Sequence, residues 1–141
     1  MKFFLLLFLM FSSPSLSDVR AVYQSQNKTK VLAMLKVLEA KSNLTTDEQC
    51  YKAVFLCLKA DYLTWPNEKL AAFKKGYGDL NTLVNSNPQN AEYRYHRYMI
   101  EKHTPSWLIE QSHMKEDRAY VLANLKASHP MSAFIRKTIE K

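Results

Sequence analysis

Glycine is scarce in this sequence, with only two in 141 residues. No stretch of strand length alternates apolar and polar residues, so nothing indicates a sheet with one buried face. Apolar residues instead recur at helical spacing along most of the chain. We therefore expect an all-α fold, a compact antiparallel stack of about six to seven helices, in a single domain.

Cysteine is scarce as well, which limits any disulfide framework. Cys50 and Cys57 lie seven residues apart in one expected helix, so their Cα atoms would be roughly 10.5 Å apart along its axis. A disulfide requires less than about 7 Å. We expect two buried free thiols that pack as small apolar groups, and a bridge between two chains remains the alternative.

Neither a patch of one charge sign nor a catalytic motif is present. Residues 18–87 carry ten basic and seven acidic groups, and residues 88–141 carry nine and six. Such even spacing argues against a nucleic-acid or membrane surface. There is no nucleophile elbow, zinc-binding HExxH helix or phosphate-binding glycine loop. Glu92, His96 and His103 could join His113 around a metal, but three ligands on one helix give poor tetrahedral geometry. We expect no catalytic residue, metal or cofactor.

The amino terminus contains the one long apolar run, nine residues from Phe3 to Phe11 that follow Lys2. A bilayer core needs about 20 helical residues, so the run is too short to span it. A positive charge, a short apolar run and small residues at Ser15 and Ser17 are the layout of a secretory signal peptide. We expect residues 1–17 to be removed, leaving 18–141 as an exported, periplasmic or secreted domain without stable membrane insertion. The alternative is a retained anchor or a buried first helix.

Prolines, caps and apolar stripes predict where the helices lie. One helix could begin as early as Asp18 and ends near Lys41, and later helices cover about 46–63, 66–87, 91–103, 112–126 and 131–139, with a short turn near 106–109. Gly76 and Gly78 fall inside the second of these later helices. Each costs about 1 kcal/mol relative to alanine there. We expect close approach of a neighbouring backbone to compensate, and a kink is the alternative.

The turn around Pro88 organises the chain. Pro88 ends one helix, and Asn87 or Asn90 can cap the next. The sequence from Pro88 to Glu92 resembles the turn between tetratricopeptide repeats. In the preceding helix, Gly76 falls at a position where such repeats have a small residue. Because Arg94 and Arg97 follow where such repeats place other residue types, one degenerate helical hairpin is indicated rather than an array.

A second resemblance covers roughly residues 50–120. Its shared positions are Pro66, Lys69, Leu70, Phe73, Pro88, Asn90, Glu92, Arg94, Tyr95, Arg97, Pro105, Leu108 and Asp117. On these residues the chain resembles a group of small exported helical proteins of Bacteroidetes-type bacteria that have no assigned activity. The resemblance implies export and an all-α fold, and it implies no chemistry.

Five charged residues form the candidate site. Glu92, Arg94 and Arg97 lie on the helix expected to be central, and Asp61 and Asp117 lie on helices that could flank it. Arginine can bridge carboxylates through its planar fork of donors. We expect a partly buried salt-bridge network in which loss of Arg94 or Arg97 costs about 3 kcal/mol. The alternative is a site for an anionic ligand or acidic peptide.

Two functions therefore remain open. The first is a non-catalytic helical interaction or scaffold domain that binds another exported protein or an envelope component through a groove between helices. The second is a small-ligand or enzyme domain that uses the Arg94/Arg97 region. A concave pocket around these arginines would favour the second.

Overall fold

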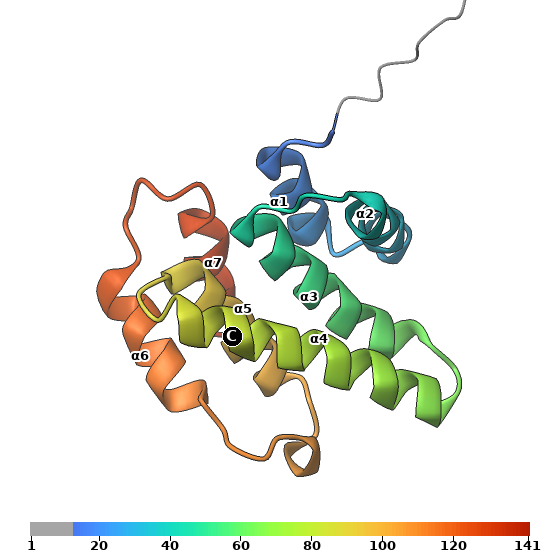
Figure 1. Cartoon of the computed structure of the whole chain (residues 1–141). Coiled ribbons are helices and arrows are strands. Elements are labelled where there is room, and N and C mark those ends of the chain that lie inside the picture. The colour runs from blue at the N-terminus through green and yellow to red at the C-terminus, as the bar shows by residue number, and fades with distance from the viewer. Residues whose placement is uncertain (1–12) are drawn as a thin grey trace, which may run out of the picture.

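The computed structural model describes residues 13–141, and within them every regular element is a helix (Figure 1). The expected all-α fold is confirmed. In chain order the helices are α1 (Leu16–Ser25), α2 (Lys28–Ala40), α3 (Thr46–Tyr62), α4 (Pro66–Ser86), α5 (Ala91–Lys102), the 3-10 turn η1 (Ser106–Leu108), α6 (Met114–Asn124) and α7 (Ser132–Ile139). None of these helices is both long and apolar enough to cross a bilayer. Most of the expected signal peptide lies outside the described residues.

The first expected helix is divided into two. Gln26 adopts a left-handed φ of 52°, which ends α1, and the Asn27 side chain then accepts a hydrogen bond from the Lys30 amide to begin α2. At the start of α1, Ser15 and Asp18 form a reciprocal capping box. The cleavage expected after Ser17 would therefore fall inside the first turn of α1 and remove its cap.

Helices α3 and α4 form an antiparallel hairpin whose contact depends on Gly76. A Cβ atom at this position would lie 2.8 Å from the Ala53 carbonyl oxygen, 2.8 Å from the Cys57 sulfur and 2.9 Å from the Cys57 amide nitrogen. The expected close approach is confirmed at Gly76 and is wrong at Gly78, where a Cβ would meet nothing within 4 Å. Cys50 and Cys57 are buried free thiols on the same helix.

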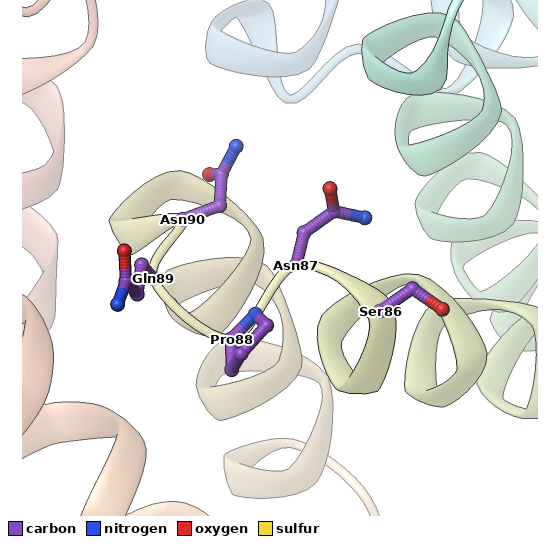
Figure 2. Close-up of a pocket in the computed structure, with 5 residues that line it drawn as sticks. All are labelled: Ser86, Asn87, Pro88, Gln89 and Asn90. Carbon is purple, nitrogen blue, oxygen red and sulfur yellow. The ribbon is translucent and has the colours of Figure 1, made fainter.

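The turn at Pro88 joins α4 to α5, and Figure 2 shows the side chains of Asn87 and Asn90 on the same side of it. Asn90 caps α5, since its side chain accepts from the Tyr93 amide at 3.0 Å. Asn87 instead donates to the Leu83 carbonyl of α4 at 2.9 Å. A small hollow of about 390 Å³ lies over residues 86–90. The two asparagine side chains beside it already serve the helix ends.

Helix α5 is the centre of the fold. It contacts α3, α4, α6 and α7, and Figure 1 shows it lying behind α4. Nine of its 12 residues are buried. Apart from the tyrosines, five of these nine have ionisable side chains: Glu92, Arg94, His96, Arg97 and Glu101. A buried charge must be paired or hydrogen-bonded to be tolerated. The fold is therefore organised by the partners that the neighbouring helices supply to α5.

Candidate functional site

Asp117 of α6 is the partner of both central arginines. It is fully buried, and its two oxygens accept from Arg97 Nε at 2.7 Å and Arg97 NH2 at 2.8 Å, a two-pronged pair. Arg94 NH1 reaches the same carboxylate at 3.2 Å. Burial alone would lower the pKa of Arg97, but the bonds to Asp117 raise it overall. This cluster fastens α6 to α5.

Other donors of the two arginines also have protein partners. Arg94 Nε donates to the Pro88 carbonyl at 2.6 Å, its NH1 lies 3.4 Å from Glu116, and its guanidinium stacks over the Tyr120 ring at 4.4 Å. Arg97 NH1 donates to the Asn81 side chain at 3.3 Å. A site that binds an external anion would leave such donors free. These arginines instead connect the Pro88 turn, α4 and α6.

Glu92 does not join this cluster, although the sequence placed it there. Its carboxylate accepts from Arg20 of α1 at 2.8 and 3.0 Å and from the Tyr51 hydroxyl of α3 at 2.6 Å. His129 lies 3.8 Å away. Burial alone would raise the pKa of Glu92, but the bonds from Arg20 and Tyr51 lower it overall. Glu92 therefore connects α5 to the amino-terminal half of the fold.

The expectation that Asp61 belongs to a partly buried salt-bridge network is wrong. It is exposed, and its side chain forms no ion pair among residues 13–141. Asp61 continues the helical stripe of Cys50, Val54 and Cys57, but it lies in the last turn of α3, where its side chain is exposed. A helical stripe predicts burial only as far as a neighbouring element extends.

A third cluster, around Glu101, was not singled out from the sequence. Glu101 is buried and accepts from the Tyr77 hydroxyl, from the His113 amide at 2.9 Å and from the His113 ring at 2.8 Å. In the sequence, the only indication of this cluster is that Glu101 lies on the same side of the helix as Arg94 and Arg97. Because His113 directly precedes α6, Glu101 fixes both ends of the segment between the two helices, residues 103–113, which we call the rim loop.

His96 is the one buried polar side chain of α5 with no hydrogen-bond partner among the described residues. Its ring lies edge-on to those of Tyr23, Tyr51 and Tyr95, with centroids 4.7, 4.9 and 5.3 Å away. Burial lowers the pKa of His96 to about 4. The imidazole is therefore neutral at physiological pH and acts as an aromatic packing group. Around it, no three metal-ligating side chains of residues 13–141 gather closely enough to hold an ion.

A second concave feature is a cavity of about 1190 Å³ between α3, α4, α5 and α7, also lined by Tyr23 of α1, which we call the central cavity. Its apolar wall comes from all four helices and from the rim loop: Leu58, Ala60, Pro66, Leu70, Phe73, Met99, Ile100, Pro105, Trp107, Leu108 and Phe134. Ligand sites in proteins usually measure about 300–1,000 Å³ and are mostly apolar with a few polar groups. The central cavity, at about 1190 Å³, is slightly larger than this range and has a lining of the same kind.

The polar side chains that line the central cavity are mostly uncharged, namely tyrosines, threonines and a glutamine, and its charged groups are mainly cationic. Its charged lining consists of Lys69, Lys137 and Lys141 together with a single acid, Asp61. At the rim, Trp107 leaves 80% of its surface exposed. An indole left in water beside an apolar cavity is typical of a surface that an occupant covers. Neither Arg94 nor Arg97 lines this space.

Residues 13–141 thus form an all-helical domain in which ionic clusters connect α5 to its neighbours and a large, mostly apolar cavity lies between the helices. Comparison with protein-family models, with curated proteins and with solved structures finds no match for this chain.

Proposed function

We propose that this chain is an exported, non-catalytic helical binding domain, and that its binding site is the central cavity. One observation carries the proposal: about 1190 Å³ of mostly apolar space opens beside an exposed tryptophan, in a domain whose buried charges are otherwise paired. Apolar surface left facing water is unfavourable by about 25 cal/mol per Å². An apolar occupant would remove that cost.

The paired arginines support binding at the central cavity over binding at the Arg94/Arg97 region. An anionic ligand there would have to compete with Asp117, whose carboxylate is fully buried and held by both arginines. Displacing one partner of a buried ion pair typically costs about 3–5 kcal/mol. The central cavity requires no such exchange.

Export is supported by the amino-terminal sequence, in which Lys2 precedes nine apolar residues and then small ones. The proposed partner is accordingly another exported protein or a component of the cell envelope. The resemblance to exported proteins of Bacteroidetes-type bacteria remains a prediction from the sequence. So does the resemblance to a tetratricopeptide hairpin, which concerns helices α3 and α4.

A cavity-filling variant tests the proposal. Met99→Trp places a large side chain into the central cavity, whereas Val37→Trp adds the same indole to an exposed position of α2 that does not line it. Tagged protein is recovered from the envelope fraction of its own source, and everything that elutes on denaturation is identified by mass spectrometry. We expect an occupant with wild type and Val37→Trp and none with Met99→Trp. An occupant retained equally by Met99→Trp would refute binding in the cavity.

A further inference from the structure

The central cavity has a cation fixed in its wall. Lys69 belongs to the first turns of α4, and its ammonium donates to the Leu63 carbonyl at 3.0 Å and to the Asp61 carbonyl at 3.3 Å. An ammonium group has three N–H donors. These two bonds to the end of α3 hold the charge in place and leave one donor without a protein acceptor in the described chain.

Further positive potential lies along the same wall. Pro66 lines the cavity at the amino end of α4, and Trp65 supplies no side-chain cap there, so amide hydrogens of the first turn stay free of side-chain acceptors. A helix amino terminus carries roughly half a positive charge. From the opposite side, α7 contributes Lys137, which is exposed and lines the cavity. Asp61 is the only acid in the lining.

The apolar part of the cavity calls for a different chemistry. Leu70, Phe73, Met99, Ile100 and Phe134 form a surface without side-chain hydrogen-bonding groups. The backbone groups behind it belong to helices and already bond within them. A wall of this kind suits a chain of methylene groups, which needs no hydrogen-bond partner.

We propose that the central cavity binds a long-chain carboxylate, with its alkyl chain between α4, α5 and α7 and its anionic group at Lys69, in a positive potential to which Lys137 contributes. This inference rests on the proposed function and specifies the occupant. The charges and the apolar surface of the lining favour this class of ligand, because its single anionic group can pair with the fixed cation while its long apolar chain contacts the apolar wall. A helical peptide from a partner would in addition have to place its polar face and its helix ends.

Tryptophan fluorescence supplies the measurement. Trp65 and Trp107 are the only two tryptophans, and in Trp65→Phe all of the indole emission comes from Trp107, at the cavity rim. Palmitate is titrated into this variant, and hexadecanol serves as the uncharged ligand of equal chain length. We expect palmitate to shift the emission to shorter wavelength, as water is excluded from Trp107, and hexadecanol to bind more weakly.

Two lysine variants separate the charge from the cavity. Lys137→Glu reverses a lining charge, and Lys115→Glu makes the same change at an exposed position of α6 outside the lining. We expect Lys137→Glu to weaken palmitate binding by about fivefold to tenfold and to leave hexadecanol unaffected. Lys115→Glu should change neither. Raised ionic strength should weaken palmitate binding alone.

Three results would overturn the inference. Palmitate that does not bind, palmitate affinity unchanged by Lys137→Glu, or palmitate binding that persists in Met99→Trp would each exclude a carboxylate held in this cavity. A different outcome is that wild type binds an acidic amphipathic peptide and no palmitate, and that Met99→Trp does not bind the peptide. This would refute a carboxylate as the occupant and would support the proposed function. If Met99→Trp changes the binding of no ligand, the proposed function fails with it.

Discussion

Replacing Gly76 by alanine tests how closely α3 and α4 approach each other. The added Cβ would lie 2.8 Å from a carbonyl oxygen and 2.9 Å from an amide nitrogen of α3, where ordinary contact begins at 3.4 Å. Both are backbone atoms and cannot rotate away, so the helices must separate. Overpacking of this kind costs about 1–3 kcal/mol, against a gain of at most about 1 kcal/mol in helix propensity. We expect a net loss of stability of about 1–2 kcal/mol.

Gly78 is the matched control for this substitution, because it lies two residues further along the same helix and faces open space. Gly78→Ala should stabilise the protein by about 0.5–1 kcal/mol through helix propensity alone. Urea unfolding followed by far-ultraviolet circular dichroism measures both variants against wild type. Equal effects of the two substitutions, or a Gly76→Ala protein as stable as wild type, would refute the close approach of the helices.

Four further substitutions test the charged clusters, the buried histidine and the first helix cap. Arg97→Ala leaves a buried carboxylate short of its main partner and should cost about 3 kcal/mol in urea unfolding, while Asp61→Ala should cost almost nothing. His96 has a pKa lowered to about 4 from 6.5, so the unfolded chain takes up its proton first, and the stability that His96 contributes, present above pH 6.5, should fall by about 3 kcal/mol as the pH drops to 4. His96→Phe should flatten that fall, and an unchanged pH profile would contradict the assignment. Ser15→Ala removes the α1 cap and should cost about 1 kcal/mol in thermal unfolding, provided Ser15 is present in the protein measured.

Helix positions could be predicted well because local signals specify them. Pro66 and Pro88 lie at helix boundaries, and side-chain caps begin several helices. The break between α1 and α2 was missed, since it depends on a left-handed Gln26, a residue type that rarely marks a helix end. Helix α3 begins at Thr46, as expected, and Thr45 caps it.

The site was less accessible from the sequence. Arg94, Arg97 and Asp117 could be singled out because charges on central helices need partners. The partner of Glu92 could not, because Arg20 is 72 residues away in the chain and only the tertiary fold brings the two together. The central cavity was beyond prediction for the same reason. It is bounded by side chains from five helices, and no single segment carries its pattern.

The bond between Glu101 and His113 has a consequence for how an occupant could exchange. Since α5 ends directly before the rim loop and Glu101 of that helix accepts from both the amide and the ring of His113, the two ends of this segment are anchored to one rigid support. Between these ends, Leu108 and Ile109 pack against the core, whereas Trp107 is 80% exposed. Uptake and release would then depend on the local motion of about ten residues, on the nanosecond-to-microsecond scale of surface loops, and the helices could stay packed throughout.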